Sequence, residues 1–266
     1  MNDFTPQKQP QARPDISMME ATANAYVFVK SHYHTLLKWA VVPIVLGFFS
    51  YIVIDWQEVG DNRLNTFLYG LPATATFAWY VFVQTRLQVM GEFAGQLPLD
   101  DHYADQRRDD MKASICCYIL FQMAMALITF GLSQRLEMPE GRENVSPDQM
   151  IIVTAGLIIM FWMLKYGLLH LVTAVGGSIK GYLKRVQGSW FSFLLIGVGF
   201  VSTLPVLLIF MFALSLVAPA ATGDDLQTTA RFGLYAIGTI MSWAVITVLN
   251  AALVDVLRQL YKGTKK

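Results

Sequence analysis

Charged side chains are scarce in this sequence. Aspartate, glutamate, lysine and arginine make up 15% of its 266 residues, whereas a soluble domain usually contains about 25%. The few charges nearly cancel, with a formal net charge of +1 at pH 7. A chain without a basic excess lacks the electrostatic footprint of a nucleic-acid-binding protein. We therefore expect no nucleic-acid partner, and the low charge argues against an ordinary soluble domain.

Cysteine is nearly absent as well. The two cysteines of the chain, Cys116 and Cys117, are adjacent. Adjacent cysteines do not form the spaced framework of a disulfide-stabilised domain. We therefore expect two free thiols near a membrane interface.

Motifs for catalysis and cofactor binding are missing too. The sequence contains no nucleotide-binding loop, zinc-protease helix, nucleophile elbow or haem-attachment motif. The segment GGSIKG at 176–181 follows an apolar stretch rather than a strand, so it does not fit a phosphate-binding loop. His32 and His34 are two residues apart, which places them on different sides of a helix rather than in a metal-binding pair. The sequence predicts no enzyme, no catalytic residue, no metal site and no cofactor.

Long apolar runs are the main feature that is present. Hydrophobic residues make up 55% of the chain, and its mean hydropathy is +0.44. Several runs reach the ~20 residues that a helix needs to cross a ~30 Å hydrocarbon layer. The apolar segments cover residues 36–54, 65–83, 113–132, 150–175, 190–218 and 232–254. Because a span must satisfy its own backbone hydrogen bonds, we predict an all-α, polytopic membrane bundle with six transmembrane helices.

Basic residues are divided unequally between the two sides of this topology. The connections after the first, third and fifth spans contain four lysines and arginines, whereas the termini and the other connections contain fifteen. Positively charged loops stay in the cytoplasm, so both termini are predicted to be cytoplasmic. The polar, proline-containing residues 1–16 are predicted to form a disordered cytoplasmic tail. Residues 17–266 then form the six-span membrane domain.

Amphipathic helices are predicted between the spans on the cytoplasmic side. Residues 17–35 are predicted to form one such helix, and a similar stripe around Arg86 follows the second span. The apolar face of the first helix comprises Met18, Thr22, Ala25, Val29, Tyr33 and Leu36. After the fourth span the stripe comprises Ile179, Leu183, Val186 and Trp190, with Lys180, Lys184 and Arg185 off it. Such helices either lie in the headgroup plane, with the basic side toward anionic lipid, or pack against the bundle as cytoplasmic caps. Lys180, Lys184 and Arg185 are therefore candidate contacts for an anion or a lipid headgroup.

One lysine, Lys165, lies deep inside a span, whereas Lys38 falls at the start of the first one. Lys165 lies about 22 Å from the start of the fourth span, in the predicted cytoplasmic half. Its ammonium either extends toward the inner interface or lines a polar cavity, where it would contact an anion or a lipid phosphate. No acidic residue lies in a predicted span, and the neutral polar candidates there are Gln122, Tyr166, Ser192 and Asn250. His170 is predicted to lie at the inner interface.

The connection between the second and third spans is highly charged. Residues 97–110 contain five aspartates, one histidine and two arginines. A hard cation needs clustered carboxylates, but this segment has no EF-hand spacing and its charges alternate in sign. We predict a solvated loop whose charges pair with one another.

Two segments carry a resemblance to a known group of proteins. They are AYVFVKSHYHTLLKWAVVPIVL at 25–46 and FAWYVFVQTRLQVMGE at 77–92, and the second includes Trp79, Arg86, Gly91 and Glu92. They resemble an uncharacterised family of bacterial six-helix inner-membrane proteins. The layout is also similar to the membrane domain of some bacterial glycerophosphodiesterases, without the catalytic domain. The resemblance covers about a quarter of the chain. It implies a six-helix fold in a bacterial inner membrane, and it transfers no known activity and no functional residue to this chain.

Two functions fit these features. The first is a non-enzymatic inner-membrane protein that organises or senses lipid, with anionic membrane lipids as its partners, or that assists a membrane complex. The alternative is a small permease or lipid-handling transporter in which Lys165 lines an anion or lipid-phosphate site. A transporter predicts a polar cavity that reaches Lys165, whereas a scaffold predicts a tightly filled bundle.

Overall fold

The computed structural model describes residues 16–57, 63–94, 101–136, 147–217 and 228–262. Every regular element in these ranges is a helix, which confirms the all-α prediction. The segments long and apolar enough to cross a membrane are Met18–Trp56, Leu64–Met90, His102–Ser133, Gln149–Ala174, Trp190–Ser215 and Arg231–Lys262. The chain is therefore a multi-pass helical membrane protein with six candidate spans.

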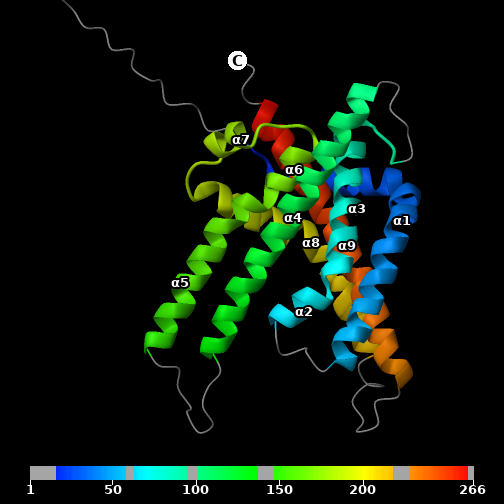
Figure 1. Ribbon diagram of the computed structural model, residues 1–266, viewed down its shortest axis with the longest axis vertical. Helices are drawn as coiled ribbons and strands as arrows, with labels where there is room; N and C mark the ends of the chain where they lie inside the picture. The colour runs from blue at the N-terminus through cyan, green and yellow to red at the C-terminus, as the bar shows by residue number, and fades with distance from the viewer. Residues whose placement is uncertain (1–15, 58–62, 95–100, 137–146, 218–227, 263–266) are drawn as a thin grey trace, which may run out of the picture.

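The long helices alternate in direction. In chain order the elements are α1 (Met18–Trp56), α2 (Arg63–Tyr69), α3 (Leu71–Met90), α4 (Asp101–Leu136), α5 (Pro147–Met163), the 3-10 helix η1 (Leu164–Leu168), α6 (Leu169–Ala174), α7 (Ile179–Arg185), α8 (Trp190–Val217) and α9 (Thr228–Lys262). Helix α1 begins and α9 ends at the same end of the bundle, which we call the terminal end (Figure 1).

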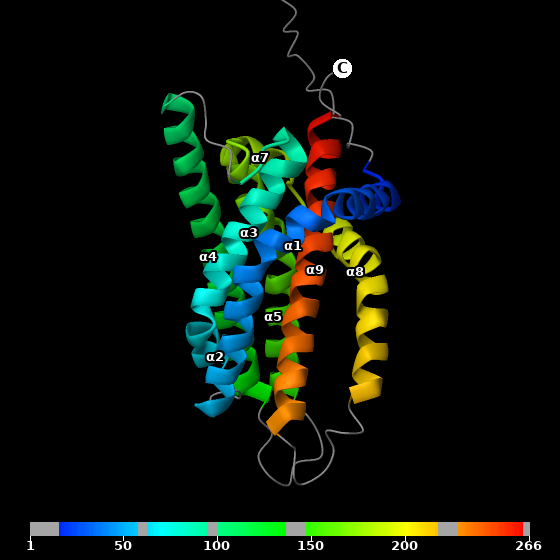
Figure 2. The same cartoon turned by 90° about the vertical axis from the view of Figure 1, so that its right-hand side faces the viewer.

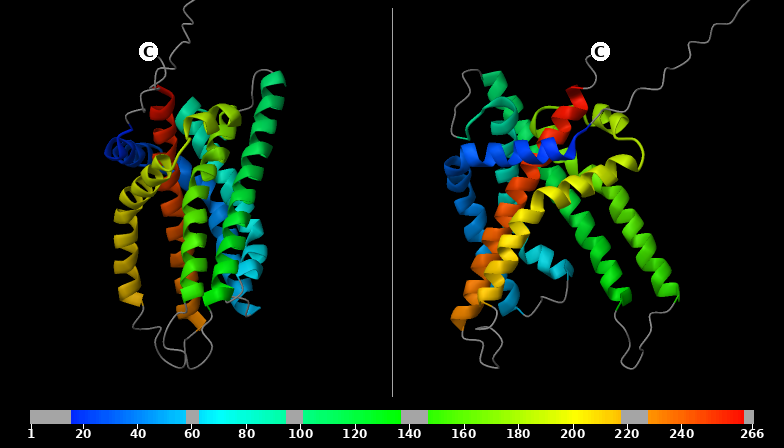
Figure 3. Two further views of the ribbon diagram at one scale, coloured as in Figure 1. Left: turned by 90° about the vertical axis from the view of Figure 1, so that its left-hand side faces the viewer. Right: turned by 180° about the vertical axis from the view of Figure 1, so that it is seen from behind.

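The helices form two groups that meet near the terminal end and diverge toward the opposite end (Figure 1, Figure 3). In the first group, α1 and α8 pack along α9. In the second group, α4 packs against α5 and α6. Helix α3 contacts α1, α9, α4 and α6, so it joins the two groups. Side chains of α3 can therefore reach both groups.

The first part of α1 lies across the terminal end of the bundle, at a steep angle to the rest of the helix (Figure 2, Figure 3). Ala21 and Ala25 are fully buried there. The Tyr26 hydroxyl donates to the Ser202 carbonyl of α8 at 2.8 Å. The predicted helix over 17–35 is thus confirmed, and it adopts the arrangement in which it packs against the bundle.

The predicted apolar stripe of this segment is only partly correct. Ala25 and Leu36 are buried, but Met18 and Tyr33 are exposed. The buried face instead runs through Ala21 and Ala25. It is set by close contact with the neighbouring helices, which favours small residues over large apolar ones.

Two predicted spans are interrupted. The second span is divided at Gly70, and Pro72 lies in the first turn of α3, where its missing N–H costs no hydrogen bond. The fourth span changes to a 3-10 helix over Leu164–Leu168. Pro43 and Pro205, by contrast, lie inside the continuous helices α1 and α8.

The predicted loop over 97–110 is wrong from residue 101 onward, because α4 begins at Asp101. Charge pairing within the segment is confirmed only in part, because Arg107 and Asp110 pair instead with Glu92 and Arg86. Arg108 pairs with Asp105, and a similar pair joins Lys112 to Asp109 at 3.6 Å. Pairs at this spacing stabilise a helix, which is the physical reason that the charged segment is helical. Among the described residues, no cluster of three histidine, cysteine or acidic side chains could hold a metal ion.

The cysteines are free thiols on α4, as predicted. Of the predicted tail over 1–16, all residues except Ile16 lie outside the described ranges.

Large apolar side chains cover the outward faces of the long helices. On α8, Leu208, Ile209 and Phe212 are all more than 60% exposed. A soluble monomer rarely exposes a contiguous apolar surface of this kind, whereas lipid chains solvate it. The exposed faces therefore fit the assignment to a membrane.

The excess of basic residues predicts that the terminal end faces the cytoplasm. In a background with Cys116→Ser and Cys117→Ser, a cysteine introduced at Asn144 should react with a membrane-impermeant maleimide added outside spheroplasts. A cysteine at Gly263 should react only after the membrane is permeabilised. The opposite labelling pattern would contradict the predicted orientation.

Candidate functional site

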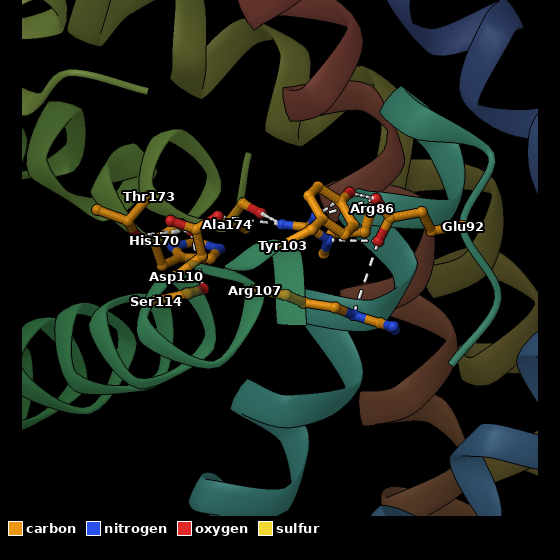
Figure 4. Close-up of polar contacts among 9 residues, drawn as sticks. All are labelled: Arg86, Glu92, Tyr103, Arg107, Asp110, Ser114, His170, Thr173 and Ala174. Carbon is orange, nitrogen blue, oxygen red and sulfur yellow. Dashed lines mark hydrogen bonds and ion pairs between the residues drawn. The ribbon is translucent and has the colours of Figure 1, made fainter. Parts of the chain in front are cut away.

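A buried arginine joins the two groups of helices. Arg86 lies near the end of α3 and is 2% exposed. Its Nε and Nη2 donate to the Glu92 carboxylate at 2.7 and 2.9 Å (Figure 4). Its Nη1 donates to Asp110 of α4 at 3.2 Å and to the Ala174 carbonyl of α6 at 2.9 Å, and Nη2 also donates to the Tyr103 hydroxyl at 2.8 Å. All five guanidinium N–H groups thereby have acceptors.

The arginine cluster, as we call it, comprises Arg86, Glu92, Tyr103, Arg107 and Asp110. Two glycines with positive φ make it possible. Gly91, at φ +72°, ends α3 and reverses the chain, so that Glu92 faces Arg86. Gly176, at φ +68°, ends the turn after α6. The Ala174 carbonyl lies in this last turn, where helix carbonyls lack partners within the helix, and it accepts from Arg86.

The charges of the arginine cluster balance. Arg107 adds a second cation, with its Nε 3.7 Å from the Glu92 carboxylate. Two arginines therefore face two carboxylates, Glu92 and Asp110. Burial disfavours the charged form of Glu92, but hydrogen bonds from Arg86 and Tyr103 outweigh it, so the pKa of Glu92 lies below its usual 4.5. Glu92 is charged at neutral pH, and its contribution to stability is lost only when pH falls through this lowered pKa.

This environment corrects the prediction for Arg86. The sequence placed Arg86 beside an amphipathic stripe that would either lie in the headgroup plane or pack against the bundle, with the arginine off the apolar face. In the structure Phe82, Val83 and Arg86 are all buried. The Gly91-Glu92 pair shortly after the arginine is a sequence feature from which the contact between Arg86 and Glu92 could have been predicted. The third partner, Asp110, is 24 residues away and could not be identified from the sequence.

A cavity of about 350 Å³ lies between α3, α4, η1, α6, α8 and α9. Most of its lining is apolar, and its most polar members are His170, Asn250 and Gln122. The His170 ring packs edge-on against Tyr118, with ring centroids 5.1 Å apart. Ser114 donates to the His170 carbonyl at 2.8 Å, one helical turn from the Ala174 carbonyl of the arginine cluster (Figure 4). The cavity is thus directly adjacent to the cluster.

Two predictions from the sequence are corrected by this cavity. His170 was predicted to lie at the interface, but it is only 8% exposed because α4 and α9 cover it. Gln122 and Asn250 were considered as partners for Lys165, but they line the cavity with His170. The lining includes Leu164 and Gly167 but not Lys165.

Lys165 is held by aromatic rings. It lies in η1 and is 7% exposed. Its Nζ is 4.2 Å from the centroid of the Trp162 ring and 5.6 Å from that of Tyr166. No carboxylate pairs with it among the described residues. Two aromatic faces offer a buried ammonium an attractive partial charge, which takes the place of an acidic partner.

The remaining candidate residues lie on α7, at the terminal end (Figure 1). Lys180, Lys184 and Arg185 are all exposed. The Arg185 guanidinium carbon is 4.4 Å from the ring centroid of Tyr261 on α9. Within the described part of the chain, Lys180 and Lys184 form no salt bridge. The structure thus places these three residues on one short helix, which the Tyr182 hydroxyl joins to η1 by donating to the Lys165 carbonyl at 2.6 Å.

The predicted stripe of this segment is partly wrong. Helix α7 ends at Arg185, and Gly188 adopts φ +95° before α8 begins. Val186 is buried, but Ile179 and Trp190 are exposed. The turn separates the two ends of the predicted stripe, so they do not share one helix face.

Comparison of the chain with models of protein families, with curated proteins and with solved structures gives no match. The functional argument therefore rests on the geometry described above.

The arginine cluster predicts a large cost for removing its cation. Arg86→Met should lower the free energy of unfolding by about 3 kcal/mol, because it leaves the half-buried carboxylates of Glu92 and Asp110 without their main partner. Arg108→Met is the matched control, since it breaks an exposed pair worth less than about 1 kcal/mol. Unfolding of the purified protein in micelles, followed by circular dichroism, measures both.

Neutralising the carboxylates gives a second control. Adding Glu92→Gln and Asp110→Asn to Arg86→Met should restore part of the stability, because uncompensated charge is then no longer buried. Equal effects of Arg86→Met and Arg108→Met would contradict the central role of the cluster.

Proposed function

We propose that this chain is a non-enzymatic protein of a bacterial inner membrane that organises anionic lipid, or assists a membrane complex, through a basic surface on α7. In this proposal both termini lie in the cytoplasm, and the α7 surface consists of Lys180, Lys184 and Arg185. The excess of basic residues on one side supports the orientation. The resemblance to bacterial six-helix inner-membrane proteins supports the location.

One contrast carries the proposal. Four other basic residues near the terminal end, on α3 and α4, all pair with carboxylates of this chain: Arg86, Arg107, Arg108 and Lys112. Lys180 and Lys184 are exposed and have no such pair within the described residues, a property that they share with Lys30 and Lys38 of α1 and Lys262 of α9. The α7 lysines differ in lying on a short helix that begins with an exposed apolar side chain, Ile179. Cations flanked by exposed apolar groups suit the boundary between anionic headgroups and acyl chains.

Removing the two lysine charges should weaken the response to anionic lipid. A cation near an anionic surface contributes about 1 kcal/mol, so Lys180→Gln with Lys184→Gln should raise the apparent Kd for phosphatidylglycerol by roughly 30-fold. The measurement is the midpoint of thermal unfolding of the full-length protein in micelles, titrated with phosphatidylglycerol at low salt.

The matched control removes the same charge from another helix. Arg108→Gln with Lys112→Gln also removes two cations, but each of these is paired with an aspartate of α4. The control should keep most of the response. If both double variants lost it equally, net charge would explain the effect and the α7 surface would not.

The alternative function, a lipid-handling transporter, is favoured by the cavity between the two helix groups. As predicted from the sequence, this function requires Lys165 to contact an anion or a lipid phosphate. The Lys165 ammonium instead contacts two aromatic rings, and Lys165 is not part of the cavity lining.

Lys165→Met separates these two functions. Methionine keeps an unbranched stem and a favourable contact with aromatic rings, so stability should change by less than about 1 kcal/mol. The stabilisation by phosphatidylglycerol should also persist. If Lys165→Met alone abolished that stabilisation while the protein stayed folded, the transporter with a phosphate site at Lys165 would be favoured.

A further inference from the structure

The cavity between the helix groups has a chemistry of its own, distinct from the α7 surface. We propose that it binds an uncharged membrane amphiphile through a hydroxyl group, which His170 and Asn250 recognise. This inference goes beyond the proposed function, because it concerns other residues, another depth and another class of ligand.

The cavity lies at a depth that lipid can reach. Every residue of its lining belongs to one of the candidate spans. Asn250 lies eight residues before Arg258 along α9, which corresponds to about 12 Å of helix. A ligand of this cavity therefore comes from the bilayer rather than from water.

The residues that line the cavity disfavour a charged ligand. The lining includes no aspartate, glutamate, lysine or arginine, and most of its residues are apolar. A phosphate or ammonium placed there would lose its hydration without gaining an ion pair. The head group of the ligand must therefore be uncharged. This property separates the ligand from the anionic lipids expected at α7.

Two buried polar side chains define the hydrogen-bonding requirement. His170 and Asn250 are 8% and 4% exposed. The Nδ1 of His170 and the Oδ1 of Asn250 make no hydrogen bond of normal geometry, although the two side chains lie close together. The Asn250 Nδ2 donates over a long 3.4 Å to the Thr85 hydroxyl.

A hydroxyl group matches this pair of side chains. It donates one hydrogen bond and accepts others, so it can donate to the amide oxygen of Asn250 and accept from the Nδ1 of His170 in the tautomer that carries its proton there. An ester or an ether offers acceptors alone and leaves the amide oxygen unpaired. The hydroxyl is thus the feature by which the cavity distinguishes its ligand from other neutral lipids.

Access from the bilayer is provided at the side of the bundle. Ile196 belongs to the lining and is 48% exposed. Gly199, one turn along α8, also lines the cavity. A Cβ atom added at Gly199 would lie 3.7 Å from the Leu249 side chain, so a larger residue there would occupy space at the cavity wall.

The test compares ligands whose hydroxyl is free with the same ligands whose hydroxyl is acetylated. The probes are dioctanoylglycerol and geranylgeraniol, which represent a glyceride and a prenyl alcohol as possible sources. Their controls are 1,2-dioctanoyl-3-acetylglycerol and geranylgeranyl acetate, and dioctanoyl phosphatidylglycerol serves as the charged comparison. Thermal unfolding of the full-length protein in micelles, titrated with each probe, gives apparent affinities.

At least one hydroxyl probe should bind about 3- to 10-fold more tightly than its ester control, as one net hydrogen bond implies. Asn250→Leu and His170→Phe should each abolish this preference. Ser192→Ala should keep it, because Ser192 is also buried with an unpaired hydroxyl but does not line the cavity. Gly199→Leu, which narrows the cavity and leaves both polar groups in place, should weaken binding even if the other variants fail to fold.

Four results would overturn the proposal. The first is equal binding of hydroxyl and ester probes to the unmodified protein, which would mean that any apolar chain fills the cavity. The second is an unchanged preference in folded Asn250→Leu and His170→Phe. The third is that neither hydroxyl probe binds. A further contradicting result is that the charged probe binds and that Gly199→Leu weakens its binding as much as it weakens binding of the hydroxyl probes.

Discussion

The pairing of Arg86 with two carboxylates and a helix-end carbonyl is the interaction on which the rest of the structure depends. A guanidinium that is 2% exposed is tolerable only if its donors are satisfied and its charge is balanced. Its partners come from the chain after α3, from α4 and from α6. Satisfying one side chain therefore fixes three segments relative to one another. Because water is largely excluded, each partner also becomes costly to remove.

Helix α3 is anchored on its other side by neutral polar groups. The Tyr80 hydroxyl bonds to Thr247 at 2.8 Å. Gln84 and Gln88 donate to the carbonyls of Thr247 and Ala251 at 2.7 and 2.9 Å. Lipid cannot replace such bonds, so they give the contact between α3 and α9 a definite register. The arginine cluster and this polar row together place α3 between the two helix groups, and the cavity lies where those groups meet.

Two sets of basic residues at the terminal end differ in their surroundings. Those of α3 and α4 are neutralised within the chain, and they stabilise its helices and its packing. The lysines of α7 are exposed, which leaves their charge available to lipid headgroups. Lys165 represents a third case, because aromatic rings surround its ammonium at a depth where no carboxylate was available. Composition alone does not distinguish these environments, although the lipid-binding proposal depends on the difference between them.

The sequence by itself determined the helical class, the number of candidate spans and their approximate limits. These properties are local, because a run of apolar residues of sufficient length must form its own hydrogen bonds in a bilayer. The predicted span over 190–218 and the observed helix Trp190–Val217 agree for this reason. Even the charged start of α4 could have been read as helical from its pairs at a spacing of three residues.

Only the tertiary structure decided which polar groups meet. Arg86 finds Asp110 and Ala174 at sequence separations of 24 and 88 residues, and Tyr80 finds Thr247 at a separation of 167. No periodicity in the sequence encodes such encounters, because they depend on how whole helices pack. For the same reason the sequence placed His170 at an interface, whereas packing against α4 and α9 buries it beside Asn250. The spans follow from local hydrophobicity, but the site follows from buried polar groups that must find partners across the bundle.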